Sequence, residues 1–80
     1  MARYGVKTKR SPEEIIQQAI DFFGKDGVGL EVTDRSSCCA SFQGGGGHVS
    51  VTVNEGEKTE VELVTREFDY DVKQFVRQIV

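Results

Sequence analysis

Four consecutive glycines, residues 44–47, stand next to His48, the only histidine of the chain. A glycine-rich segment binds phosphate when its N–H groups lie at the start of a helix and a Lys followed by Ser or Thr completes the site. Here the glycines lie between two stretches of alternating apolar residues, and neither that lysine nor a helix pattern follows them. We therefore interpret residues 44–47 as a mobile turn between two strands, because glycine adopts almost any φ.

Cys38 and Cys39 are adjacent, so they cannot cross-link distant parts of a fold, and we expect them to be reduced, as is usual in the cytoplasm. In a strand they would point to opposite faces, with Cys38 in the core and Cys39 on the wet face. Cys39 and His48 are then the candidates for a metal site, or for a thiol nucleophile with its base. Structural zinc takes four ligands, so we predict no metal, no cofactor, no catalytic thiol and a solvated His48.

Three glutamates, Glu31, Glu60 and Glu62, fall on the polar side of alternating segments. Paired carboxylates perform acid–base chemistry when burial separates their pKa values. These three are expected on an open sheet surface, where burial is absent. We predict cross-strand charge pairing with Lys7 and Lys9 instead of catalysis.

The basic residues near the N-terminus form the one basic cluster of the sequence: Arg3, Lys7, Lys9 and Arg10. A net charge of −3 disfavours nucleic acid and phosphate as ligands, because both need a basic surface. No aromatic residue alternates onto the wet face, where it could stack on bases. We expect these side chains to be solvated charges at a sheet edge.

The first element that must position these residues is a helix over residues 11–24, "SPEEIIQQAIDFFG". Ser11 is a capping residue, Pro12 occupies the first helical position, and Glu14 completes a capping box. Apolar residues repeat at helical spacing and are flanked by two more: Ile16, Ala19, Ile20 and Phe23, beside Ile15 and Phe22. We expect Gly24 or Gly27 to end the helix in a left-handed conformation.

The apolar period then changes from 3.6 to 2, which predicts four antiparallel strands over residues 28–34, 38–43, 48–53 and 59–64. One face of each strand is apolar and the other is wet. The residues expected to face inward are Val28, Leu30, Val32, Cys38, Ala40, Phe42, Val49, Val51, Val53, Val61 and Leu63. In the turn over residues 54–58, we expect Gly56 to supply a positive φ.

A second helix is predicted from a cap at Asp69 to the last residue, with a stripe formed by Val72, Phe75, Val76, Ile79 and Val80. Residues 3–9 also alternate and indicate an edge strand, protected by its lysines and paired with residues 59–64. The order is β-α-β-β-β-β-α. Since one sheet face is wet, both helices must cover the other, which predicts a single α+β domain over residues 1–80, a two-layer sandwich.

This order resembles the β-α-β4-α arrangement of one repeat of the TATA-binding protein and of helix-grip (START/Bet v 1-like) domains. The segments "SPEEIIQQAIDFF" and "EVELVTREFDYDVKQFVRQIV" are also similar to the start and end of small uncharacterised bacterial proteins. The resemblance is topological and covers the whole chain. It implies a curved antiparallel sheet and no particular function, because such folds host unrelated activities.

The composition, 38% hydrophobic and 29% charged over 80 residues, is that of an ordinary globular domain. No apolar run approaches membrane-spanning length, and no apolar stretch follows the basic N-terminus as in a secretory signal, so we expect a cytoplasmic protein with no membrane partner.

With no catalytic constellation in view, the favoured function is a non-enzymatic binding or protein-interaction module. It would use its polar sheet face or a sheet edge, with a homodimer or another protein as the partner. The first alternative is a carrier of a small apolar ligand, with Phe23, Phe42 and Phe75 lining a site between the last helix and the sheet. The second alternative is nucleic-acid binding. A filled core would argue against the carrier.

Overall fold

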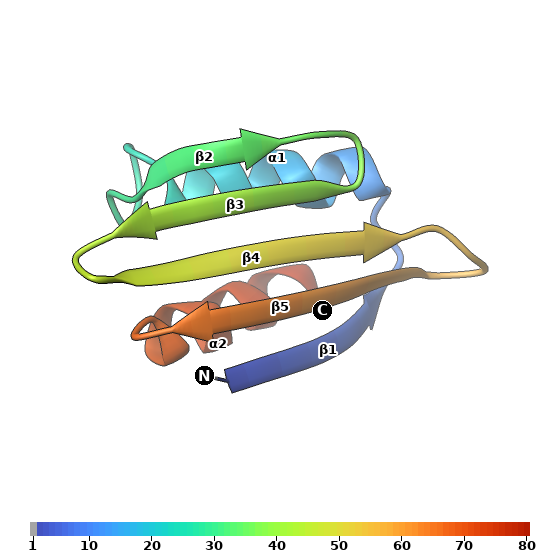
Figure 1. Cartoon of the computed structure of the whole chain (residues 1–80). Coiled ribbons are helices and arrows are strands. Elements are labelled where there is room, and N and C mark those ends of the chain that lie inside the picture. Colours follow the sequence, from blue (N-terminus) through green and yellow to red (C-terminus); the bar gives the residue numbers. More distant parts are fainter. Residues whose placement is uncertain (1) are drawn as a thin grey trace.

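In the computed structural model, which describes residues 2–80, a five-stranded antiparallel sheet carries both helices on one face (Figure 1). The elements in chain order are β1 (Ala2–Thr8), α1 (Pro12–Phe23), β2 (Glu31–Arg35), β3 (Cys39–Gly44), β4 (Gly47–Asn54), β5 (Thr59–Arg66) and α2 (Asp69–Ile79). The order of the strands across the sheet is β1-β5-β4-β3-β2. This confirms the α+β two-layer prediction and the β-α-β4-α order.

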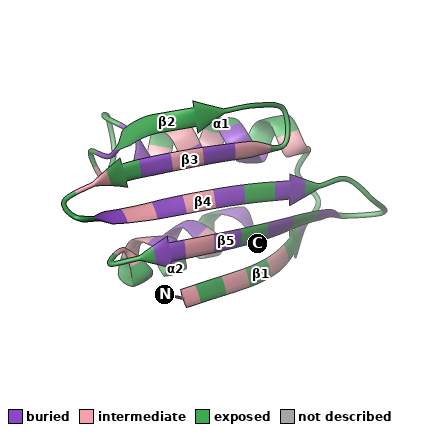
Figure 2. Cartoon of the chain, in the orientation of Figure 1, coloured by how far each residue is buried: buried purple, intermediate pink, exposed green. Residues whose placement is uncertain are grey.

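The core lies between the sheet and the two helices, and the strands alternate between buried and exposed positions (Figure 2). Its fully or nearly buried apolar residues are Ile15, Ile16, Ala19, Phe23, Leu30, Ala40, Phe42, Val49, Val51, Val53, Val61, Leu63, Val72, Phe75 and Ile79. The inward face predicted from the period of 2 is therefore confirmed for the central strands. Ile20, Phe22 and Val76, which were expected within or beside the helical stripes, are half-buried against this core.

The start of α1 follows the prediction. The Oγ atom of Ser11 accepts a hydrogen bond from the N–H of Glu14 at 3.2 Å, and Pro12 is the first helical residue. The side chains of Ser11 and Glu14 also hydrogen-bond to each other at 3.3 Å. These contacts satisfy one of the free N–H groups at the helix start and fix where α1 begins.

The end of α1 differs from the prediction of a left-handed glycine. Gly24 caps the helix in an extended conformation, with φ −73° and ψ −163°, and a positive φ occurs later, at Gly29 (96°). A Cβ atom on Gly24 or on Gly27 would collide with a carbonyl oxygen of α1. Glycine is needed at both positions because the backbone passes close to the helix, which a sequence pattern does not distinguish from a left-handed turn.

Of the two predicted hairpin turns, the structure confirms the one at residues 44–47 but not the expected conformation of Gly56 in the other. Residues 44–47 form a tight turn between β3 and β4, in which Gly45 and Gly46 have φ of 55° and 83°. A two-residue turn of type I′ requires positive φ at both central positions, so the glycines have a defined conformational role here. Gly56 is not among the residues with positive φ, so the expectation for the turn between β4 and β5 was wrong.

β2 is the most exposed strand. It begins at Glu31, later than predicted, and its pairing with β3 is interrupted by a bulge between Val32 and Asp34. Val32 was expected in the core but is 38% exposed, because β2 lies at the sheet edge, whereas Leu30 just before the strand is buried.

β1 pairs with β5, as the sequence predicted, and the register places Lys7 opposite Glu60. Its inner side is held against α2, since Thr8 donates a hydrogen bond from Oγ1 to the carbonyl oxygen of Ile79 at 2.6 Å. Val6 is half-buried on the same side, while Lys7 is exposed. The first strand is therefore an ordered edge of the sheet.

Asp69 was expected to cap α2 but is its first helical residue, and the N-cap Phe68 makes no side-chain capping bond. The carboxylate of Asp69 instead accepts a hydrogen bond from the hydroxyl of Tyr4 at 3.2 Å, which ties β1 to the start of α2. The pKa of Tyr4 is raised above its usual 10.0, first by desolvation and then by the hydrogen bond and charge of Asp69. Val80 lies beyond the end of α2 and is 77% exposed, so it does not extend the apolar stripe.

Candidate functional site

The sheet face opposite the helices carries no other element of the described chain, and we call it the open face (Figures 1 and 2). It consists of the outward-facing residues of the five strands. In sheet order these are Arg3, Gly5 and Lys7 on β1; Glu60, Glu62, Val64 and Arg66 on β5; His48, Ser50, Thr52 and Asn54 on β4; Cys39, Ser41 and Gln43 on β3; Glu31 and Asp34 on β2.

Charge is distributed unevenly over the open face. The formally charged residues lie on β1 and β5 at one side and on β2 at the other, while the outward residues of β4 and β3 include no Asp, Glu, Lys or Arg. Ser41, Ser50 and Val64 are half-buried although they point away from the core. The open face thus has a neutral centre and charged sides.

A single line of cross-strand neighbours crosses this face, and we call it the central row. The strand pairings place Arg3 opposite Val64, Val64 opposite Ser50, Ser50 opposite Ser41, and Ser41 opposite Asp34. The row runs from a cation at β1, through an apolar and two small residues, to an anion at β2. Arg3 was expected from the sequence to be a solvated edge charge, but Asp34, the other end of the row, was not singled out. Alternation along residues 59–64 also points Val64 outward.

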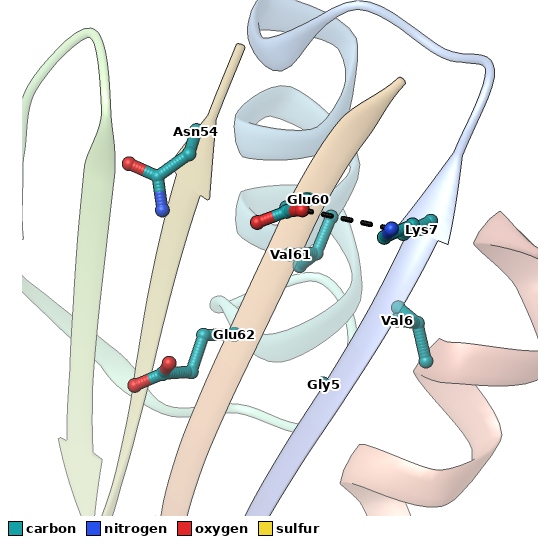
Figure 3. A pocket seen from close by; sticks show the side chains of 7 residues that line it. All are labelled: Gly5, Val6, Lys7, Asn54, Glu60, Val61 and Glu62. Atoms are coloured by element: carbon teal, nitrogen blue, oxygen red, sulfur yellow. Dashed lines mark ion pairs between the residues drawn. The ribbon is translucent and has the colours of Figure 1, made fainter. Parts of the chain in front are cut away.

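Two ion pairs join β1 to β5 on the open face. Arg3 lies 3.6 Å from Glu62, and Lys7 lies 3.8 Å from Glu60 (Figure 3). The predicted charge pairing of the glutamates with Lys7 and Lys9 is therefore confirmed for Lys7. Lys9 was wrongly expected to take part, because β1 ends at Thr8 and Lys9 lies beyond the strand, whereas Arg3 supplies the second cation.

Exchanging the charges of one pair tests its contribution. Lys7→Glu places like charges on opposite strand positions and is expected to lower the free energy of unfolding by roughly 0.2–1 kcal/mol. The double variant Lys7→Glu/Glu60→Lys should recover most of this loss. Urea unfolding at low and high salt measures both, since salt screens exposed pairs. A double variant no more stable than the single one would show that the pair contributes nothing.

Gly5 leaves a hollow in the open face beside these pairs. The hollow is bordered by Lys7, Glu60 and Glu62 and reaches Asn54 on β4, with the backbone of β1 and β5 at its base (Figure 3). A Cβ atom on Gly5 would meet nothing within 4 Å, so the site has room for an added side chain. The hollow is open to solvent, and its charged rim is unsuited to enclosing an apolar ligand.

His48 lies on the open face, as predicted, but far from Cys39. Cys39 stands opposite Thr52 on β4, four residues from His48, which corresponds to roughly 13 Å along a strand. Among residues 2–80, no three His, Cys, Asp or Glu side chains cluster closely enough to hold a metal ion. The two residues that the sequence offered as a combined metal or thiol–base site are therefore held apart.

Glu31 is also separated from the other two glutamates. It lies on β2 opposite Gln43, with β3 and β4 between it and β5. Glu60 and Glu62 are two residues apart on β5, and each faces a cation on β1 rather than a carboxylate partner. This arrangement corresponds to charge pairing at the sheet surface.

The cysteines depart from the sequence prediction. Cys38 and Cys39 are joined by a disulfide, and Cys38 is exposed rather than packed in the core. The alternation rule does not apply to Cys38 because β3 begins only at Cys39 and the preceding residues form a bend. Cys39 is half-buried on the open face, as expected.

The aromatic residues proposed for a ligand site fill the core instead. Phe23, Phe42 and Phe75 are each at most 1% exposed. The ring centroid of Phe23 lies 5.4 Å from that of Phe42 and 5.1 Å from that of Phe75, which is normal packing between aromatic side chains. The space that an apolar ligand would need between α2 and the sheet is occupied by these three rings.

No protein-family model and no curated protein matches the chain. Among solved structures, the chain is similar to the solution structure of the Aha1 dimer from Colwellia psychrerythraea, with a TM-score of 0.60 and 18% sequence identity. The similarity covers 98% of this chain and 88% of that one. At this identity it shows a shared fold, consistent with a helix-grip-like α+β arrangement. No helix in the described part of the chain is long and apolar enough to cross a membrane.

Proposed function

We propose that the chain is a non-enzymatic protein-interaction module whose open face binds a second copy of the same chain. The observation that carries this proposal is the central row, which has a neutral middle and opposite charges at its two ends. Protein interfaces have this anatomy, with charge depleted at the centre and concentrated in a polar rim.

The row is complementary to itself. A two-fold axis parallel to the strands and above β4 would place β1 of one protomer over β2 of the other, as symmetric dimers require. Arg3 would then face Asp34 of the second copy at both ends of the row, and Ser50 would lie on the axis. Within the central row, Ser50 and Ser41 next to the axis have short side chains, so the two sheets can approach closely there.

The sheet edges are less suited to association than the open face. β2 is short and bulged, and bulges twist an edge away from further pairing. β1 is shielded along part of its length by the long charged side chains of Arg3 and Lys7. The structural neighbour is described as a dimer, which agrees with a self-associating module on this fold.

The size of the open face sets the expected affinity. Five strands about 4.8 Å apart, with roughly seven residues at about 3.4 Å each, cover roughly 600 Å² per protomer. Two such faces bury about 1,200 Å² in total, the lower end of specific interfaces. A small interface whose central contacts are short polar side chains is expected to bind weakly, because affinity at a given area depends on the quality of the contacts. The expected dissociation constant is therefore in the micromolar range or weaker.

Sedimentation velocity over about 10 μM to 1 mM tests the proposal. The wild type should shift from monomer to dimer with concentration. Ser50→Arg should abolish the shift, because it places two cations together on the axis. Gln78→Arg, an exposed change on α2 in the helix layer, is the matched control and should behave as the wild type.

Charge reversal at the ends of the row tests the orientation. A symmetric dimer contains two Arg3–Asp34 pairs, and each exposed pair contributes about 0.2–1 kcal/mol. Arg3→Asp or Asp34→Arg should therefore weaken the dimer by roughly 2- to 30-fold. The double variant should restore association. A wild type that stays monomeric at 1 mM, or a Ser50→Arg variant that still dimerises, would overturn the proposal. Loss of the dimer in Thr33→Pro, which removes an N–H from the β2 edge, would indicate edge pairing instead.

A further inference from the structure

The Cys38–Cys39 pair lies at the start of β3, on a segment whose backbone is fixed by hydrogen bonds. The N–H of Ser36 donates to the carbonyl oxygen of Cys39 at 2.8 Å, and the N–H of Val53 donates to the carbonyl oxygen of Cys38 at 2.8 Å. Cys39 is also paired with Thr52 in the ladder between β3 and β4. Both cysteines are therefore held by the sheet, not by the disulfide alone.

This backbone brings two sulfur atoms together that regular alternation would send to opposite faces. Because Cys38 precedes the strand, its side chain turns toward that of Cys39, and the two are bonded. When the bond is reduced, the same hydrogen bonds retain the two thiols as neighbours. The Oγ atom of Ser36 lies 3.5 Å from the Sγ atom of Cys38, close enough to donate a weak hydrogen bond to the sulfur.

The surroundings of the two cysteines decide which metal or metalloid atom they can bind. Cys38 is exposed and borders a surface groove shared with Pro12 and Glu13 at the start of α1, so a reagent can reach the sulfur. No cluster of three or more His, Cys, Asp or Glu side chains is present in residues 2–80, so the pair lacks the further ligands that tetrahedral zinc requires. Two soft thiolates with no third protein ligand suit a sulfur-binding metal or metalloid atom that needs only two bonds to protein sulfur.

We infer that the reduced Cys38–Cys39 pair is a chelating dithiol site for trivalent arsenicals, and that the disulfide is its closed, oxidised state. A phosphine reductant opens the site, because the phosphine takes up oxygen from water and delivers two electrons and two protons to the sulfurs. The two thiols then replace the oxygen of an arsenical: two arsenic–sulfur bonds form, the arsenic–oxygen bond breaks, and the oxygen leaves as water with the two thiol protons. Arsenic remains trivalent throughout.

Phenylarsine oxide is the probe. The full-length chain, reduced with a phosphine, should bind one arsenical per monomer by native mass spectrometry, with protection of both thiols from alkylation. The disulfide form should bind none. Cys38→Ser and Cys39→Ser should each bind about 10²- to 10⁴-fold more weakly, because the second sulfur of a linked pair acts at a high effective concentration. Ser37→Ala, at the exposed residue next to the pair, keeps both thiols and is the matched control, expected to bind as the wild type.

Two results would overturn the inference. One is a Cys38→Ser or Cys39→Ser variant that binds as tightly as the reduced wild type, and the other is a complex in which one arsenical joins two chains. Circular dichroism verifies that the serine variants fold. A test without variants is competition on the wild type: a small dithiol should remove the arsenical at concentrations where an equal amount of monothiol does not, and equal removal by both would show that no chelate had formed. Cys39 belongs to the open face, so binding is measured at protein concentrations below those at which the dimer forms, and its outcome is then read on the monomer.

Discussion

Replacing Phe75 by alanine is expected to lower the free energy of unfolding by about 3–5 kcal/mol. Phe75 is completely buried on α2, and its ring centroid lies 5.1 Å from that of Phe23 and 5.6 Å from that of Phe22, both on α1. The side chain therefore joins the two helices over the sheet. Removing it leaves a cavity that rigid strands on one side and two helices on the other cannot close.

The size of this loss matters because a domain of 80 residues is expected to have a stability of only about 4–12 kcal/mol. Urea unfolding followed by circular dichroism measures the effect. Tyr70→Ala, at a residue of the same helix that is 73% exposed, is the control and should change stability by less than about 0.5 kcal/mol. A Phe75→Ala variant with the unfolding midpoint of the wild type would show that α2 does not pack as described.

Much of the fold could be predicted because its elements have clear periods and few ways to combine. The helix from Ser11 and the alternating strands were identified from local pattern alone. The pairing of β1 with β5 needed one further argument: α1 carries the chain across the sheet, so the first strand is free to lie beside the last. That topology and alternation together place Lys7 and Glu60 on the same face of neighbouring strands, and the register of the structure sets them opposite each other.

The errors concern positions where tertiary contacts decide the local conformation. Gly24 is needed because the chain passes close to α1, and Asp69 does not cap α2 because its carboxylate bonds to Tyr4, 65 residues away in sequence. Val32 has the pattern of a core residue, but its strand lies at an edge. None of these contacts is visible in the residues next to the position concerned.

The open face was predicted in character but not in detail. Alternation placed His48, Cys39 and the glutamates on a wet face, yet it could not show that Arg3 and Asp34 end one continuous row, because this depends on the register of four strand pairs and on the bulge in β2. The disulfide was missed for a related reason. Alternation separates adjacent side chains only inside a strand, and β3 begins between Cys38 and Cys39.

The four glycines between β3 and β4 are expected to respond very differently to substitution, although the sequence presents them as one run. Gly47 is buried, and a Cβ atom there would collide with the carbonyl oxygen of Arg66 and lie 2.8 Å from side-chain atoms of both Glu67 and Phe68. Glu67 has a positive φ of 78°, so the turn after β5 has little freedom to move away. Gly47→Ala should therefore lower the free energy of unfolding by about 1–3 kcal/mol, as overpacking does.

Gly45→Asn is the matched control, because a Cβ atom at Gly45 would meet nothing within 4 Å and its φ of 55° is one that asparagine tolerates. Asn-Gly is a favoured pair for type I′ turns, so this variant should keep its stability or gain up to about 1 kcal/mol through a less flexible unfolded chain. Thermal and urea unfolding of the two variants, measured side by side, make the comparison. Equal stability of both would mean that residues 44–47 form a loose loop without a fixed approach to the turn at Glu67, as the glycine run alone suggests. A large loss of stability in Gly45→Asn with none in Gly47→Ala would show that the tight contact lies at Gly45 rather than at Gly47. The register of β4 described above would then be wrong.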